Sequence, residues 1–317
     1  MDIAFSALPR ALRAVVVDAA RICLDLFKVM VPILIGVKLL KELGWIAYLA
    51  KPLAPLMSLV GLPPECGLTW ATAIANNLYA GLAVHAALVP DMAPLTVAQA
   101  TVIATMMLIA HNLFVEGAIA KRCGVGFWGQ AVLRLAGALA CGMLLNGVFS
   151  ALGVFTDPAP LLFTPSTEDG SLWAWAFGEI KNLGMIYCVI AALVGTMRLL
   201  ETLGVTRIFE AALLPFLRLM GIGGGAATIT VIGLVMGLAY GSGLILHDVQ
   251  KGKVAPRDVF SAISLMSLSH ALIEDTLLMY LIGASLWGTF VGRLLFSLAV
   301  VAVLSRVAAG LARPRLA

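Results

Sequence analysis

Two stretches of this sequence are versions of each other: His111-Asn112-Leu113-Phe114-Val115-Glu116 and His270-Ala271-Leu272-Ile273-Glu274-Asp275. An offset of 159 residues relates them, and of the 25 positions that begin at each histidine, 8 are identical: His, Leu, Gly, Trp, Gly, Val, Arg and Leu. Each stretch places a histidine and an acid inside a long apolar run. Ionisable groups are costly in lipid and by default mark a functional site there. A site that is built twice, once in each half, predicts a transporter made of two repeats.

The composition indicates a membrane protein. Hydrophobic residues make up 61% of the chain and charged residues only 12%, about half the charged fraction of a soluble domain. The mean hydropathy is +1.02. Several apolar runs exceed the roughly 18 residues that indicate a membrane-spanning helix, and they are too long and continuous for the strands of a barrel. Because lipid requires backbone groups to be satisfied internally, the sequence predicts an all-α polytopic membrane protein.

The charge and the cysteines narrow the possible partners. The net charge of +4 is modest, so the basic residues are interpreted as topology signals and no nucleic-acid partner is expected. The expected partners are the lipid bilayer and a small polar solute or ion, and a homo-oligomer is an option that the sequence leaves open. Residues 1–13 lack the pattern of a cleavable signal and are expected to form an interfacial helix. The five cysteines form no CxxC pair and are interpreted as packing residues.

The apolar segments divide the chain into two halves. The first repeat, residues 1–155, contains segments 14–43, 47–62, 67–89, 97–120 and 127–155. A proline-rich linker, residues 156–172, precedes the second repeat, residues 173–317, with segments 173–200, 206–222, 226–246, 259–282 and 286–309. We expect each repeat to contain about three spanning helices, one short amphipathic helix and one broken or re-entrant segment.

The broken segment is expected to be the third in each half. Segment 67–89 contains Asn76 and Asn77, and segment 226–246 contains four glycines. Glycine costs up to ~1 kcal/mol relative to alanine inside a helix. We therefore predict interruptions near Asn76-Asn77 and between Gly237 and Gly241, where the backbone would open onto a cavity. The following segments, 97–120 and 259–282, are interpreted as helices throughout.

The basic residues indicate how the two halves are oriented. The loop after segment 67–89 has no basic residue, whereas the segment with His111 is followed by Lys121 and Arg122. In the second half the bias reverses, because three basic residues follow segment 226–246 and none follows segment 259–282. Since lysine and arginine accumulate on the cytoplasmic side, matching loops face opposite sides and the repeats are inverted. Both termini are then cytoplasmic, in the cytoplasmic membrane of a bacterial-type cell.

The four histidines also follow the repeat. Gly81-Leu82 with His85 matches Gly243-Leu244 with His247 at an offset of 162. Together with His111 and His270, this match places all four histidines in two repeat-related pairs, which scattered core histidines would rarely do.

Four stretches of the first half form a further series: Leu39-Leu40-Lys41-Glu42-Leu43-Gly44, Lys51-Pro52-Leu53-Ala54-Pro55-Leu56-Met57, Gly61-Leu62-Pro63-Pro64 and Asn76-Asn77-Leu78-Tyr79-Ala80-Gly81. This series resembles the Gate (nucleoside-recognition) domain, which is shared by concentrative nucleoside transporters, the ferrous-iron permease B membrane domain and spore maturation proteins A and B. The second half resembles it more weakly, so two copies would cover most of the chain. The resemblance implies membrane transport through broken hairpins. The sequence departs from the iron permease because it contains no GxxxxGK[ST] phosphate loop.

The candidate site combines residues from both halves. His270 and Glu274 are four residues apart and are expected to share a helix face, with Asp275 beside them. His111 and Glu116 are five apart, about 140° around a helix, and need not touch. The candidate substrate- or ion-binding residues are His111, Asn112, Glu116, His270, Glu274, Asp275, Asn76, Asn77, Tyr79 and Ser267, and those for a metal ion are His111, Glu116, His270 and Glu274. We expect the histidines and acids to approach one polar region near the middle of the membrane.

Three roles fit these residues. They could relay protons, bind a first-row metal ion or anchor a polar organic solute. No permanent cofactor is expected beyond a bound metal ion or a coupling cation. The alternatives are structural polar contacts between helices and a non-transport membrane partner. Trp128, Trp287, Arg134 and Arg293 are interpreted as anchors at the membrane interface. The sequence contains no HExxH or GxSxG motif, so an enzyme is not expected.

Overall fold

The computed structural model describes residues 2–162, 171–220, 222–251 and 254–311. These residues form helices and connecting loops, with no β-strand among them apart from an isolated bridge between Thr96 and Pro158. The all-α prediction is confirmed for this part of the chain. Among the described residues, five helical stretches are long and apolar enough to cross a membrane: Val97–Arg122, Phe127–Leu152, Leu172–Thr202, Arg257–Ile282 and Trp287–Val307.

The two halves contain matching series of helices. The first half contains α1 (Asp2–Glu42), α2 (Ile46–Ala50), η1 (Lys51–Leu53), α3 (Ala54–Leu59), α4 (Cys66–Ala75), α5 (Leu78–Leu88), η2 (Val89–Asp91), α6 (Val97–Ile109), α7 (Leu113–Arg122) and α8 (Phe127–Leu152). The second half contains α9 (Leu172–Thr202), α10 (Val205–Leu219), α11 (Gly224–Met236), α12 (Leu238–Gln250), α13 (Pro256–Ser269), α14 (Glu274–Met279), η3 (Tyr280–Ile282), η4 (Trp287–Gly292) and α15 (Arg293–Leu311). The inverted orientation of the halves stays a prediction.

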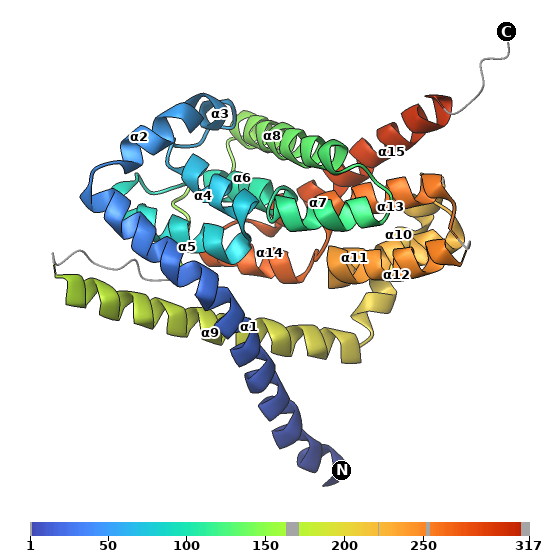
Figure 1. The fold of residues 1–317 in the computed structure, drawn as a ribbon, viewed down its shortest axis with the longest axis horizontal. Coiled ribbons are helices and arrows are strands. Elements are labelled where there is room, and N and C mark those ends of the chain that lie inside the picture. The colour runs from blue at the N-terminus through green and yellow to red at the C-terminus, as the bar shows by residue number, and fades with distance from the viewer. Residues whose placement is uncertain (1, 163–170, 221, 252–253, 312–317) are drawn as a thin grey trace.

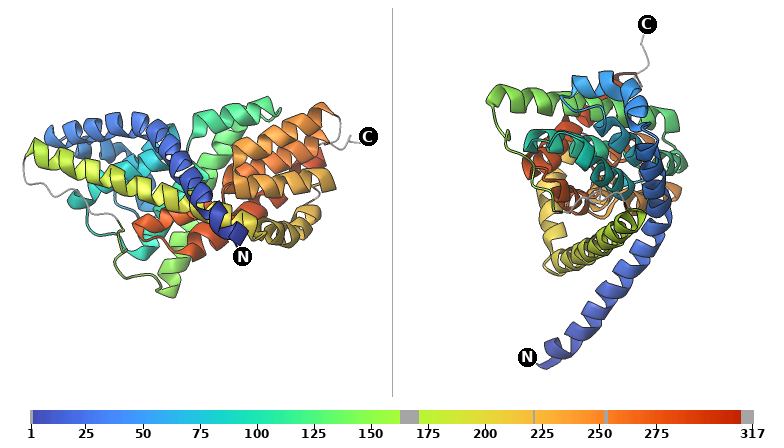
Figure 2. Two further views of the ribbon diagram at one scale, coloured as in Figure 1. Left: turned by 90° about the horizontal axis from the view of Figure 1, so that it is seen from below. Right: turned by 90° about the vertical axis from the view of Figure 1, so that its left-hand side faces the viewer.

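The long first helices of the halves, α1 and α9, cross each other on one side of the molecule (Figure 1). Ala19 and Cys23 of α1 pack against Ile190 of α9, and Asp18 forms an ion pair with Arg198. The pairs α4–α5 and α11–α12 lie toward opposite ends of the body, with α7 and α14 between them and α13 alongside α11–α12, as Figures 1 and 2 show. The two halves therefore meet along the broken helices that carry the candidate site.

Each of these outer pairs is a helical hairpin whose break was predicted. Helix α4 ends before Asn76 and Asn77, and α5 begins at Leu78, where the Asn77 side chain accepts a hydrogen bond from the Ala80 amide at 2.9 Å. Helix α11 ends at Met236 and α12 begins after Gly237, whose φ of +102° lies in the left-handed region that favours glycine. The predicted interruptions near Asn76-Asn77 and Gly237 are confirmed.

Small residues hold each hairpin closed. A Cβ added at Gly81 would lie 2.9 Å from the Ala73 Cβ, and one added at Gly241 would lie 2.6 Å from the Gly233 Cα. Ala73 and Gly81 correspond to Gly233 and Gly241 at an offset of 160. The offset of 162 that matched His85 with His247 is therefore wrong: His85 is buried inside its hairpin, whereas the His247 side chain is 60% exposed.

Segments 97–120 and 259–282 are not continuous helices, contrary to the prediction. The first breaks between Ile109 and Leu113, and the second between Ser269 and Glu274. Asn112 and Ala271, related by the offset of 159, both adopt positive φ values of 47° and 45°. Apolar composition gave no sign of these breaks, because tertiary hydrogen bonds to the hairpins stabilise them. The Asn112 amide donates to the Ala73 carbonyl at 2.9 Å, and the Leu272 amide donates to the Leu234 carbonyl at 2.8 Å.

The described part of the predicted linker contacts both halves. Ala159 donates its amide to the Leu95 carbonyl at 2.8 Å, and Leu162 donates to the Leu281 carbonyl at 3.0 Å. Residues 163–170 of the linker lie outside the described residues. The domain boundaries of the sequence analysis stay a prediction.

The hairpin contact predicts a difference between two glycines of α12. Gly241→Ala should lower the melting temperature of the purified protein, because its new methyl group meets the Gly233 backbone and overpacking of this kind costs about 1–3 kcal/mol. Gly243→Ala is the matched control: no atom lies within 4 Å of its Cβ position, so stability should be unchanged or slightly higher. Equal melting temperatures for the two variants would contradict this close packing.

The structure also sharpens the topology prediction. Cys123 and Val249 line one common cavity. The exposed Lys121 precedes Cys123 by two residues, and the exposed Lys251 follows Val249 by two residues. We expect single cysteines at positions 121 and 251, in a background without the native cysteines, to be labelled from the same, cytoplasmic, side. Asp157→Cys is the control, because Asp157 pairs with the opposite end of the α6–α7 stretch. Labelling of 121 and 251 from opposite sides would show that the halves are not inverted.

Candidate functional site

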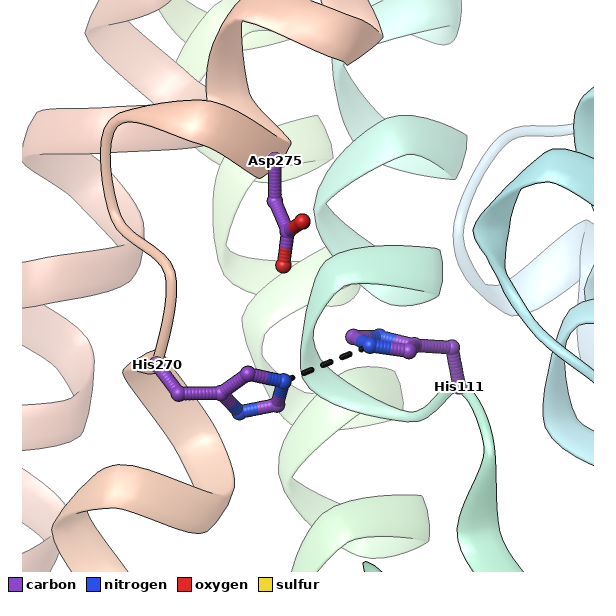
Figure 3. A group of neighbouring side chains, drawn as sticks. All are labelled: His111, His270 and Asp275. Carbon is purple, nitrogen blue, oxygen red and sulfur yellow. Dashed lines mark hydrogen bonds between the residues drawn. The ribbon is translucent and has the colours of Figure 1, made fainter. Parts of the chain in front are cut away.

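The two repeat-related histidines meet between the halves. His111 follows the end of α6 and His270 follows the end of α13, so the breaks in these helices set the direction of both side chains. The two Nε2 atoms are 3.3 Å apart, and the ring centroids are 5.1 Å apart (Figure 3). Both side chains are buried, with 6% and 5% of each residue exposed.

Glu116 completes a triangle with this pair. It lies in the first turn of α7, and its Oε1 atom is 3.3 Å from Nε2 of both His111 and His270. The helical angle of about 140° that separated His111 from Glu116 in the sequence analysis does not apply, because the helix is broken between them. The sequence left contact between these two side chains open, and the structure brings them together.

Backbone carbonyls fix the protonation of both imidazoles. Nδ1 of His111 lies 3.0 Å from the Met107 carbonyl oxygen, and Nδ1 of His270 lies 2.9 Å from that of Met266. Because a carbonyl oxygen only accepts, each Nδ1 carries a proton and each Nε2 is an acceptor when the ring is neutral. Two Nε2 lone pairs and a carboxylate oxygen then face one another at 3.3 Å. Three acceptor atoms in this arrangement could hold one shared cation, either a proton or a metal ion.

Asp275 is the acid that approaches the pair from the second half. A carboxylate oxygen of Asp275 and one ring nitrogen each of His111 and His270 all lie within 4.8 Å of one another, and Figure 3 shows the carboxylate pointing toward the two rings. Asp275 corresponds to Glu116 at the offset of 159. The proposed helix face of His270 and Glu274 is wrong, because α13 ends before His270 and α14 begins at Glu274. Glu274 lies outside the group that could hold a metal ion.

A buried arginine holds the first-half side of the cluster. Arg134 Nη1 is 2.7 Å from Glu116 Oε2. The same guanidinium donates from Nε to the Ile109 carbonyl at 2.8 Å and from Nη2 to the His111 carbonyl at 2.7 Å. These carbonyls lose their helical partners where α6 ends, so Arg134 replaces the missing hydrogen bonds in a place that water does not reach.

Arg293 holds the same position in the second half. It is fully buried and donates from Nη2 to the His270 carbonyl, whereas its Nε and Nη1 atoms have no hydrogen-bond partner. The prediction that Arg134 and Arg293 anchor the protein at the membrane interface is wrong, because both lie in the interior next to the cluster. The repeat at an offset of 159 was the signal that could have identified them. Trp128 and Trp287, with 77% and 69% exposed, do lie on the surface.

The other candidate residues lie around this centre. Asn76 and Asn77 form the α4–α5 break, and Asn112 forms the α6–α7 break. Tyr79 lines a separate small cavity of about 50 Å³ with Asn182 and Leu278. Ser267 is buried in the last turn of α13, before His270. These residues shape the breaks, whereas the charged centre consists of His111, His270, Glu116, Asp275, Arg134 and Arg293.

Comparison with known proteins agrees with the sequence motifs. Residues 23–126 match the family model described as Gate: nucleoside recognition. The uncharacterized membrane protein YvoD of Bacillus subtilis (strain 168) is 28% identical over 265 residues, which cover 82% of this chain and 83% of YvoD. No solved structure gives a significant match. Residues 23–126 are thus similar to the Gate (nucleoside recognition) family, and most of the chain is similar to a membrane protein.

Proposed function

We propose that this protein is a permease of the cytoplasmic membrane that moves a small polar solute or ion, coupled to a cation that binds between His111, His270 and Glu116. The observation that carries the proposal is the triangle of three acceptor atoms, 3.3 Å on each side, to which both halves contribute. The Gate match supports a transporter-like and non-enzymatic role. A cation at this contact would link the relative positions of the two halves to its own binding.

The charges around the triangle favour a proton as the coupling cation. Glu116 and Asp275 contribute two negative charges, and the buried Arg134 and Arg293 contribute two positive charges, so the cluster is balanced while both histidines are neutral. One added proton leaves a single positive charge that two imidazoles and Glu116 can share. A divalent ion would leave two, and each uncompensated charge in an apolar interior costs several kcal/mol.

A divalent metal ion as the transported substrate is the second candidate, because the shape of the triangle favours it. Three ligand atoms 3.3 Å apart can each lie ~2 Å from one first-row metal ion, the usual length of a metal–imidazole bond. Imidazoles that donate Nδ1 to a backbone carbonyl are typical metal ligands. Asp275 lies close enough to approach from the second half. The negative charge of Asp275 is already included in the balance described above, so a bound divalent ion still leaves two uncompensated positive charges.

The two candidates predict different results for the histidine variants. For a proton-coupled permease, uptake into proteoliposomes should follow an imposed pH gradient, and His111→Ala and His270→Ala should each reduce it at least tenfold. For a metal permease, the purified protein should bind one divalent ion, and both variants should lose it. His247→Ala is the control, because that side chain is 60% exposed and contacts Asp248, which is not part of the cluster. Wild-type uptake in both histidine variants would refute the site.

Glu116 has to be tested in a double variant with Arg134. Replacing Glu116 alone leaves Arg134 buried without a counter-charge, which lowers the free energy of unfolding by about 3–5 kcal/mol. Glu116→Gln combined with Arg134→Gln removes both charges without leaving one unpaired, so the protein should still fold, with a lower melting temperature because Arg134 no longer donates to the Ile109 and His111 carbonyls. For this double variant we expect uptake that no longer responds to the pH gradient, measured against the exposed control Glu201→Gln. If the double variant transports normally and only its melting temperature falls, the cluster is a structural contact and the non-transport alternative is favoured.

A further inference from the structure

A large cavity lies between α8 of the first half and α13 and α15 of the second. Its volume is about 870 Å³. Its wall is almost entirely apolar, and Gln130 is the polar side chain in it. Gln130 donates to the Ser264 hydroxyl at 2.9 Å, while its own Oε1 has no hydrogen-bond partner. Gln130 precedes Arg134 by one helical turn, about 6 Å along α8, so the cavity approaches the charged cluster along this helix.

At the place that the repeat relates to this cavity, the helices of the two halves pack directly on each other, and we call this the closed side. At the offset of 159, Gly129 corresponds to Gly288. A Cβ added at Gly288 would lie 2.2 Å from Thr101 Cγ2, so η4 packs directly on α6 there. A Cβ added at Gly129 would find no atom within 4 Å. The same glycine is thus buried in one half and open to the cavity in the other.

The correspondence extends to the surrounding residues. On the closed side, the Ser285 amide donates to Thr101 Oγ1 at 2.8 Å, and a Cβ at Gly292 would lie 3.1 Å from Leu145. At the offset of 159, Ser285 and Thr101 correspond to Gly126 and Phe260, and Gly292 and Leu145 correspond to Leu133 and Leu304. All four of these counterparts line the cavity together with Gly129. The residues of these contacts on the closed side therefore have their counterparts in the wall of the open side.

Two further differences accompany this asymmetry. The closed segment, Trp287–Gly292, is π-helical, whereas its counterpart lies within the α-helix α8. Single π turns inside α-helices are frequent at functional sites. At the centre, Nε of Arg134 donates to the Ile109 carbonyl, whereas the corresponding Nε of Arg293 has no hydrogen-bond partner. The two halves thus occupy two different states of one repeated arrangement.

We propose that the cavity is the open mouth of the transport pathway and that it closes by packing Gly129 on Phe260, while the Gly288–Thr101 contact opens on the other side. This inference rests on the proposed function and adds that the Gly129–Phe260 and Gly288–Thr101 contacts form in turn, never together. Because the two repeats share one design, each half can take the conformation that the other half has in this structure. In that second state the closed and the open contact change places. The cation cluster lies between the two contacts and is reached from one side at a time.

Crosslinking in a background without native cysteines tests the exchange without knowledge of the solute. Thr101→Cys with Gly288→Cys should form a disulfide, and so should Gly129→Cys with Phe260→Cys, although in this structure the cavity separates that pair. With all four cysteines present, the two disulfides should not occur in one molecule, as intact mass would show. Failure of the 129–260 pair to crosslink, or both disulfides in one molecule, would overturn the proposal.

A filling substitution gives a second test in the native background. Gly129→Leu fits into the open cavity, so folding should be retained, but closure should be blocked and uptake should fall at least tenfold. Gly147→Leu is the matched control, because Gly147 is exposed on the same helix with no atom within 4 Å of its Cβ position. Unchanged uptake in Gly129→Leu would overturn the proposal. If the parent protein transports nothing, the proposed function fails, and crosslinking still decides whether the contacts alternate.

Discussion

The arrangement of this protein depends on one requirement: backbone carbonyls that lose their helical partners in an apolar interior need other donors. Arg134 meets this requirement where α6 ends, by donating to the carbonyls of Ile109 and His111. The same guanidinium lies 2.7 Å from Glu116 Oε2. It therefore stabilises the break, turns His111 toward the second half and places Glu116 beside it. The structural role and the proposed chemical role belong to the same contacts.

The second half repeats this solution incompletely. Arg293 donates to the His270 carbonyl, but its remaining donors are unpaired, and Asp275 is only half-buried where Glu116 is buried. Two copies of one design thus meet at the His111–His270 contact in unequal states. A cation bound there would touch both halves, so its arrival or loss can shift the balance between the two states. This is the physical basis on which we connect the cluster with movement of the helices.

The sequence predicted the features that depend on local chemistry and on the repeat. Glycine and asparagine marked the hairpin breaks, and the offset of 159 paired His111 with His270. The breaks at Asn112 and Ala271 were missed, because Leu, Ile and Val continue through them and the deciding hydrogen bonds come from Ala73 and Leu234 of the hairpins. Arg134 and Arg293 were placed at the interface because an isolated basic residue near a helix end usually lies there. Only the tertiary structure shows the carbonyls that they reach.

The central claim is that His111 and His270 share one cation through their Nε2 atoms. Solid-state NMR of protein with ¹⁵N-labelled histidine, with His85 and His247 replaced, measures the protonation of both rings directly. We expect a proton on Nδ1 of each ring and a correlation between the two Nε2 atoms, either through a shared hydrogen bond or through a bound metal ion. Protonated Nε2 atoms on both neutral rings, with no correlation between them, would contradict it.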